Sequence, residues 1–138
     1  LLSVHMSLTS KSSDWITAVT AAVNLPSPDG IKDAACVPAL VSDHGCQPTS
    51  TAFFKACSEL GIRQIFASYN NPKGNADTER VIRTIKEDLI WTKEYDSTAI
   101  FENALKQWVK AYNEDYPHSS LGYMTPYEYE RWFNASAA

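Results

Sequence analysis

Two kinds of hydrophobic pattern alternate along this chain, one with a period of two residues and one with helical spacing. Leu1–Leu8 alternates apolar and polar residues, which predicts a strand with one buried face. Ser12 or Ser13 can cap a helix that follows, with Asp14 favourable in its first turn. The sequence "PSPDG" then breaks the chain.

The same alternation continues through the rest of the sequence. An apolar strand from Val37 to Val41 ends at Ser42 and Asp43. The later predicted elements, in order, are a helix capped by Thr49 or Ser50 and ended by Gly61, a strand "IRQIFAS", a long helix from about Ala76 to Lys93, a helix from Thr98 to about Asn113, and a short helix after Thr125 and Pro126. Strands alternating with helices predict an α/β layer built on βα crossovers.

Composition fits one globular domain. The chain has 138 residues, of which 44% are hydrophobic and 20% charged. No apolar run approaches the ~20 residues that a membrane span needs, so we expect no membrane partner. The chain opens without Met and directly in strand-like sequence. We therefore expect it to be a fragment of a longer protein.

The cysteines do not form a metal or disulfide pattern. They number three, contain no CxxC pair, and are Cys36, Cys46 and Cys57. Free thiols in a reducing compartment are the expectation. A zinc site using His44 and Cys46 would need two more clustered ligands, and the sequence shows none.

Charge is distributed unevenly along the chain. The net charge is −4, which is the wrong sign for a simple nucleic-acid binder. Between Leu60 and Lys93, however, six basic residues face four acids, whereas from Glu94 onward three basic residues face seven acids. An anionic partner should therefore bind the middle of the chain, although an ordinary solvated surface would explain the same pattern.

Two carboxylates occupy positions suited to chemistry. Asp43 follows a predicted strand, and catalytic groups of open α/β sheets gather at the carboxyl ends of the strands. A simple Asx turn explains Asp43 equally well. Glu79 lies in the first turn of a predicted helix, close on the helical wheel to Arg83 and Lys86. The helix dipole, or an ion pair between Glu79 and Arg83, also explains that placement.

Both acids together predict a metal site. Carboxylates brought close together repel each other unless a cation lies between them, and Mg²⁺ or Mn²⁺ suits an all-oxygen site. Two such ions can activate an attacking oxygen and stabilise a leaving oxygen in phosphoryl transfer. Two carboxylates are too few to hold two ions, so at least one more is expected.

The motifs resemble those of DDE recombinases, the retroviral integrases and integrase-like bacterial insertion-sequence transposases. The resemblance rests on "SDHGCQPTS", on the 35 residues between Asp43 and Glu79, on "GNADTERVIRTIKED", and on the closing "YNEDYPHSSLGYMTPYEYE". It covers nearly the whole chain. It implies an α/β fold of the ribonuclease-H-like kind, with a mixed five-stranded sheet flanked by helices.

The resemblance also implies roles for individual residues. Asp43 and Glu79 become the second and third acids of a catalytic triad that binds Mg²⁺ or Mn²⁺. Gly45 and Gln47 match the active-site turn, and "NNPKGN" matches a mobile loop beside it. The candidate phosphate contacts are Lys73, Arg80, Arg83 and Lys86. The alternative is that these cations only keep the protein soluble.

The front of the chain departs from the family pattern. The family's first Asp lies on a strand that precedes the one Leu1–Leu8 resembles, and Asp14 cannot replace it because Asp14 follows that strand. The chain thus resembles a core domain, residues 1–138, truncated at its N-terminus and lacking two strands. In the family's strand order of 3-2-1-4-5 the missing strands would leave a gap in the sheet.

These patterns lead to three hypotheses. The first is the catalytic core of a DNA transposase or integrase, which is inactive as this fragment. Its full-length parent is expected to act in the bacterial cytoplasm as a homo-oligomer and to transfer DNA strands between transposon ends and target DNA. The second is a non-catalytic DNA-binding or assembly remnant of such a core. The third is a nuclease of the same fold that hydrolyses DNA without transferring it.

Overall fold

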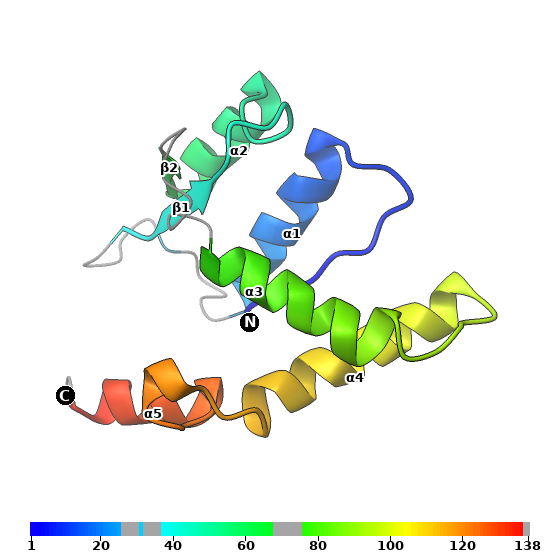
Figure 1. Cartoon of the computed structure of the whole chain (residues 1–138). Coiled ribbons are helices and arrows are strands. Elements are labelled where there is room, and N and C mark those ends of the chain that lie inside the picture. The colour runs from blue at the N-terminus through cyan, green and yellow to red at the C-terminus, as the bar shows by residue number, and fades with distance from the viewer. Residues whose placement is uncertain (26–30, 32–36, 68–75, 137–138) are drawn as a thin grey trace. The chain divides into compact units, whose positions relative to one another are not determined.

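A computed structural model describes residues 1–25, 31, 37–67 and 76–136. They form two compact units, Leu2–Thr84 and Ile85–Ala138, the second of which includes Leu1. Figure 1 shows the elements along the chain. Among the described residues, no helix is both long and apolar enough to cross a membrane.

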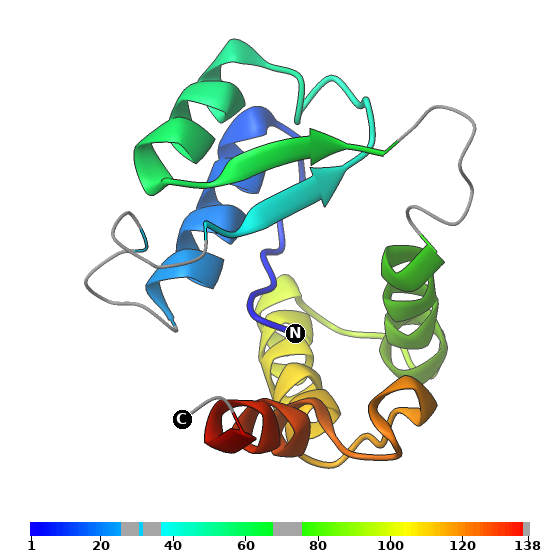
Figure 2. The ribbon, with the colours of Figure 1, turned by 90° about the vertical axis from the view of Figure 1, so that its left-hand side faces the viewer.

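The first unit is a small α/β layer. Its elements are α1 (Ser12–Asn24), β1 (Ala39–Ser42), α2 (Thr51–Leu60), β2 (Arg63–Phe66) and most of α3 (Ala76–Ile85). The strands β1 and β2 are parallel, with Val41 opposite Ile65. Figure 2 shows this strand pair with α1 behind it. The alternation of helix and strand predicted from residue 12 onward is confirmed for this unit, and the sheet among the described residues has two strands.

The core of this unit lies between α1 and α2. Phe53 is completely buried and meets Trp15 of α1 edge to face, with ring centroids 5.9 Å apart. Cys57, one helical turn after Phe53, is also buried. The helix α2 begins where predicted, because the Ser50 side chain accepts the Phe53 N–H. It ends at Gly61, whose φ of 76° favours glycine.

One face of the strand pair is exposed. Val37, Val41 and Ile65 are 52%, 51% and 39% exposed. Parallel strands are normally covered on both faces, which is why they tend to be apolar throughout. The apolar residues on this face are therefore unusual for a finished parallel sheet.

Two predictions for the N-terminal segment are wrong. Leu1–Leu8 does not form a strand, and Leu2 and Leu8 are 58% and 90% exposed. Alternating residues favour a strand, but a strand also needs a neighbour for its backbone hydrogen bonds. The cap of α1 is Lys11 and not a serine: the Asp14 carboxylate accepts the Lys11 N–H at 2.8 Å.

The second unit is helical. It contains the π-helical turn η2 (Lys86–Ile90), α4 (Thr98–Glu114), the short η3 (Ser119–Leu121) and α5 (Pro126–Ser136). The predicted caps of α5 are confirmed, since Thr125 and Glu128 exchange backbone-to-side-chain hydrogen bonds. The long helix predicted to reach Lys93 ends earlier: α3 stops at Ile85 and continues only as the π-helical turn η2. In that turn the Trp91 N–H donates to the Lys86 carbonyl.

Candidate functional site

Asp43 lies where the sequence predicted, directly after β1. Its side chain is exposed, and Oδ1 accepts the Gly45 backbone N–H at 2.9 Å. This is the Asx turn that the sequence allowed as an alternative. The two roles are compatible, because a carboxylate has about four lone-pair positions and one N–H uses only one of them.

Gly45 leaves room for this turn. A Cβ atom at position 45 would lie 3.0 Å from Asp43 Oδ1 and 3.5 Å from Pro48 Cδ. Pro48 is fully buried and cannot move away easily. A side chain at position 45 would therefore press on the carboxylate and disturb its hydrogen bond.

Gln47 connects this turn to a distant part of the first unit. Its Nε2 donates to the Ser10 carbonyl at 2.8 Å and approaches Ser10 Oγ at 3.2 Å. The sequence did not reveal Ser10, because 37 residues separate it from Gln47 and no local pattern marks a contact of that range. His44, beside Asp43, lies against Phe66 of β2 with ring centroids 5.1 Å apart.

Glu79 lies in the first turn of α3, as predicted, with Asp77. Residues 76–80 are exposed. The apolar side chains near Glu79 are covered unevenly: Ile82 of α3 is 46% exposed, whereas Leu89 of η2 is 6% exposed. Glu79 is thus an exposed acid at the positive end of a helix dipole.

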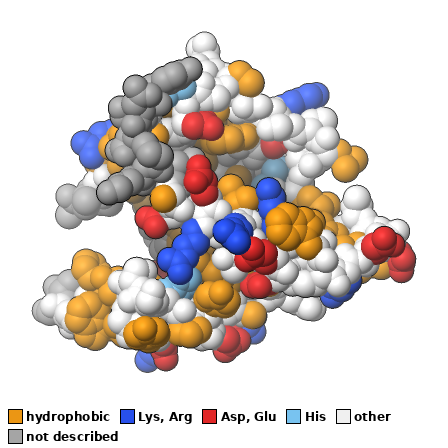
Figure 3. Space-filling model, in the orientation of Figure 1, with side chains coloured by type: hydrophobic (Ala, Val, Ile, Leu, Met, Phe, Trp, Pro, Cys, Tyr) orange, Lys and Arg blue, Asp and Glu red, His pale blue; other side chains and the backbone are white. Residues whose placement is uncertain are grey.

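Two of the candidate DNA contacts, Arg80 and Arg83, follow Glu79 on α3, and Lys86 begins η2. Arg80, Arg83 and Lys86 are exposed, whereas Lys73 lies outside the described residues. Figure 3 shows Lys and Arg side chains gathered with Asp and Glu side chains over the α3 part of the molecule. Because positive and negative side chains are mixed on this surface, its cations are compatible both with contacts to DNA phosphates and with an ordinary solvated surface.

The described residues do not form a complete metal centre. Nowhere among them do three or more His, Cys, Asp or Glu side chains cluster closely enough to hold a metal ion. The predicted pair of Asp43 and Glu79 therefore has no third acid beside it in the described part of the chain. Exposed carboxylates are nevertheless the donors that Mg²⁺ and Mn²⁺ prefer.

The described cysteines behave as the sequence predicted. Cys46 is an exposed free thiol and Cys57 a buried one; Cys36 lies outside the described residues. Burial raises the pKa of the Cys57 thiol, which keeps it protonated. Cys46 Sγ lies 3.2 Å from Gln47 Oε1, within a turn held by hydrogen bonds.

Comparisons with known proteins agree with this fold. The family model for the integrase core domain matches residues 60–126. The transposase of insertion sequence element IS904 from Lactococcus lactis subsp. lactis (strain IL1403) is 26% identical over 92 residues, which are 66% of this chain and 36% of that transposase. The transposase InsD for insertion element IS2 on the F plasmid of Escherichia coli (strain K12) is 33% identical over 72 residues, 52% of this chain and 24% of InsD.

Solved structures show the same fold. The catalytic core domain of BIV integrase has a TM-score of 0.63 and 21% identity, covering 93% of this chain and 76% of that one. A chain of the simian T-cell lymphotropic virus intasome has a TM-score of 0.56 and 22% identity, covering 79% and 36%. The fold is thus of the ribonuclease-H-like α/β class found in integrase cores.

By its fold and these matches, the chain is similar to integrase-like cores of the DDE transposase kind. The chain spans about a third of the length of the IS904 transposase and about a quarter of InsD.

Proposed function

We propose that this chain is the greater part of a catalytic core that transfers DNA strands in a transposase or integrase. The observation that carries the proposal is the placement of Asp43. A carboxylate at the carboxyl end of a parallel strand, in a turn that leaves little room for a side chain at position 45, occurs here on a fold shared with integrase cores.

Asp43 and Glu79 are the residues that would hold the metal. Both are exposed carboxylates on separate elements, and such a donor set suits Mg²⁺ or Mn²⁺. When bound, the ions would favour attack of a DNA 3′-hydroxyl on a phosphodiester. The chain's own part is to orient Asp43 through the Gly45 N–H, to anchor the turn to Ser10 through Gln47, and to present Glu79 in the first turn of α3.

DNA is the proposed substrate, with transposon ends and target DNA as its two forms. Arg80 and Arg83 extend from the same helix as Glu79, and Lys86 begins the π-helical turn that follows it in the chain. Cations there could hold backbone phosphates close to the reacting group. The intact protein is proposed to act as a homo-oligomer in the bacterial cytoplasm. The similarity to transposases and to a chain of a viral intasome supports DNA as the partner.

Two carboxylates cannot complete the site, so we propose that residues 1–138 are a core truncated at its N-terminus. The first two strands of the family sheet, with a third acid, would come from elsewhere in the protein. The greater length of the relatives supports this. The fragment by itself is then inactive.

Metal-dependent strand transfer by the full-length protein tests the assignment. Asp43→Asn keeps an oxygen that can accept the Gly45 N–H but removes the charge, so the turn should persist while transfer is lost. Glu79→Gln should have the same effect. Asp77→Asn is the matched control, because Asp77 lies in the same exposed helical turn. Full activity of both site variants would refute the assignment.

The same assay separates the other two hypotheses. A non-catalytic DNA-binding remnant would bind DNA in a salt-sensitive way, and the binding would survive Asp43→Asn, but the full-length protein would transfer no strands. A nuclease would give products whose new ends carry oxygen from water and not a joined DNA strand.

A further inference from the structure

Gln64 of β2 lies on the covered face of the strand pair. It stands opposite Leu40 of β1 in the parallel register, and paired residues place their side chains on the same face of a sheet. Leu40 lines a cavity together with residues of α1, so this is the face that the helices cover. Val41 and Ile65, one position further along, are the exposed pair on the other face. The Gln64 side chain therefore points into the first unit.

The Gln64 side chain reaches a carbonyl group 16 residues earlier in the chain, where its Nε2 donates to Pro48 at 2.6 Å. A carbonyl oxygen only accepts hydrogen bonds, so the amide atom that faces it must be the nitrogen. Pro48 is fully buried, and a buried carbonyl left without a donor costs more free energy than an ordinary hydrogen bond contributes. Gln64 therefore satisfies a backbone group that is shielded from solvent.

Pro48 belongs to the turn that orients Asp43. The Thr49 N–H and Oγ1 both donate to the Gly45 carbonyl, at 3.2 Å and 2.8 Å. Gly45 also lies close to Pro48, because a Cβ atom at position 45 would be 3.5 Å from Pro48 Cδ. The Gly45 N–H in turn donates to Asp43 Oδ1. A displacement of Pro48 therefore moves the group that directs the carboxylate.

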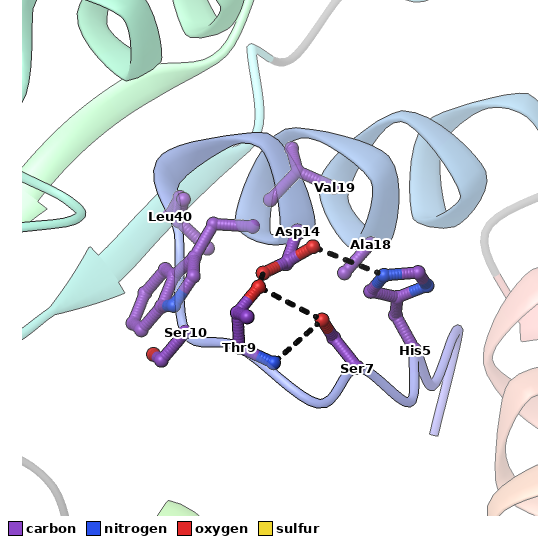
Figure 4. Close-up of a pocket in the computed structure, with 9 residues that line it drawn as sticks. His5, Ser7, Thr9, Ser10, Asp14, Ala18, Val19 and Leu40 are labelled. Atoms are coloured by element: carbon purple, nitrogen blue, oxygen red, sulfur yellow. Dashed lines mark hydrogen bonds and ion pairs between the residues drawn. The ribbon is translucent and has the colours of Figure 1, made fainter.

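Two glutamine amides hold this turn to two separate segments of the chain. Gln47 Nε2 donates to the Ser10 carbonyl at 2.8 Å, and Ser10 lies in the segment that leads into α1 (Figure 4). Gln64 holds the next residue of the turn, Pro48, from β2. Because the two anchors lie on different elements, losing one of them leaves the turn free to pivot about the other.

The oxygen of the Gln64 amide shows what this position contributes. Oε1 is buried and has no hydrogen-bond partner among the described residues. An unpaired buried acceptor destabilises a fold, and a methionine of similar length would avoid that cost. A position that served packing alone would therefore not need an amide. The N–H donor is the feature that distinguishes Gln64 from an apolar residue at this position.

We propose that Gln64 is a positioning residue for Asp43. It holds the Pro48 carbonyl, and through Pro48 it fixes the turn in which the Gly45 N–H directs the carboxylate. The consequence for metal binding rests on the function proposed above: a carboxylate held in this way is already oriented when the ion binds. Gln64 acts through the turn and not on the reacting atoms.

Amide hydrogen exchange of the 138-residue chain tests the link from Gln64 to Gly45. Gln64→Met removes the donor and the unpaired Oε1 while keeping the length of the side chain. We expect the Gly45 amide to exchange roughly 10-fold faster in this variant. The Ala67 amide, which donates to the Ser42 carbonyl of β1, should stay protected and show that the variant folds. Gln107→Met is the matched control, because it makes the same change at an exposed position of α4 and should leave Gly45 unaffected.

A second variant guards against a packing effect. Gln64→Leu also removes the donor, but its branched side chain packs differently from methionine. Faster exchange at Gly45 in both variants therefore reports the missing donor.

Strand transfer by the full-length protein separates positioning from stability. A carboxylate that is free to turn must be ordered when the ion binds, so Gln64→Met should raise the Mg²⁺ concentration for half-maximal transfer by roughly 10-fold. Saturating Mg²⁺ should restore most of the rate. A purely structural defect would instead lower the rate by the same factor at every Mg²⁺ concentration, because it removes folded protein.

Three results would overturn the proposal. The first is unchanged exchange at Gly45 in variants that keep Ala67 protected. The second is an unchanged Mg²⁺ requirement. The third is loss of Ala67 protection in both variants, because Gln64 would then be needed for the fold as a whole.

Failure of the proposed function looks different. The unmodified full-length protein would then transfer no strands, or Asp43→Asn would stay fully active. The exchange of the Gly45 amide would still decide whether Gln64 holds the turn.

Discussion

The Asp43 carboxylate and the Gly45 backbone N–H are joined by a 2.9 Å hydrogen bond, and a Cβ atom at position 45 would lie only 3.0 Å from the same oxygen. The hydrogen bond therefore depends on the absence of a side chain at position 45. This pair fixes the direction of the carboxylate that we propose as a metal ligand.

Replacing Gly45 should break this bond. We expect Gly45→Ala to lower the free energy of unfolding by about 1 kcal/mol, because the carboxylate must turn away from the N–H group. Urea denaturation of the 138-residue chain measures the change. Because no positive φ is involved at Gly45, the loss should come from the contact and not from backbone strain.

A double-mutant cycle checks that origin. With Asp43→Ala already in place, Gly45→Ala should cost much less, because the carboxylate that the new methyl group meets is gone. Equal costs of Gly45→Ala in both backgrounds would mean that the methyl group disturbs something other than Asp43.

Asp14 should make the first unit sensitive to acid. Its carboxylate accepts the Lys11 N–H, and this bond, with smaller contributions from Ser7, Thr9 and His5, lowers the pKa of Asp14 below 3.8. A lowered pKa in the folded state stabilises the fold above the unfolded pKa, and the stabilisation is lost as pH falls through the folded value. We expect Tm to drop below about pH 4, and Asp14→Asn to make this drop smaller.

His5 provides the control for this effect. Its Nε2 lies 3.7 Å from Asp14 Oδ1, so it could contribute through charge. If the Lys11 bond dominates, His5→Gln should leave the acid transition in place. Loss of the transition in His5→Gln would assign the effect to the ion pair instead.

Local signals in the sequence predicted most elements correctly. Ser50, Gly61 and Thr125 mark helix ends through bonds within a few residues, and each behaves as the sequence indicated. Leu1–Leu8 was mispredicted because its pattern shows which residues could be buried but not whether a neighbouring strand exists.

In the candidate site, too, the local geometry was predictable and the contacts between distant residues were not. Asp43 and its turn follow from residues 43–48 alone, and the structure confirms the local geometry. The bond from Gln47 to Ser10 could not be predicted, because it depends on how α1 packs beside the turn. The metal site joining Asp43 to Glu79 stays a prediction.

Tyr123 occupies a backbone conformation that should reduce stability. Its φ is +64°, in the left-handed region, and its side chain is 77% exposed. It follows Gly122, also left-handed, in a turn closed by the Met124 N–H on the Leu121 carbonyl. Since Asn tolerates this region better, Tyr123→Asn should raise the free energy of unfolding by about 1 kcal/mol.

Tyr127 supplies the comparison for Tyr123. It is 52% exposed at the start of α5, where the backbone is helical. Tyr127→Asn should therefore give no such gain in urea denaturation. A gain of equal size in both variants would point to the loss of an exposed aromatic ring and not to relief of backbone strain.

The exposed cations of α3 and η2 should determine how DNA binding depends on salt. A phosphate contact releases counterions, so each one adds roughly 0.9 to the slope of log K against log salt. Arg80→Gln and Lys86→Gln should each lower that slope by about 1, as measured by fluorescence anisotropy of the full-length protein on duplex DNA. Lys106→Gln is the control, because Lys106 lies on α4 and pairs with Glu102 at 2.9 Å. If Arg80→Gln and Lys86→Gln change the slope no more than Lys106→Gln does, these cations only keep the protein soluble, and DNA must approach the core by another surface.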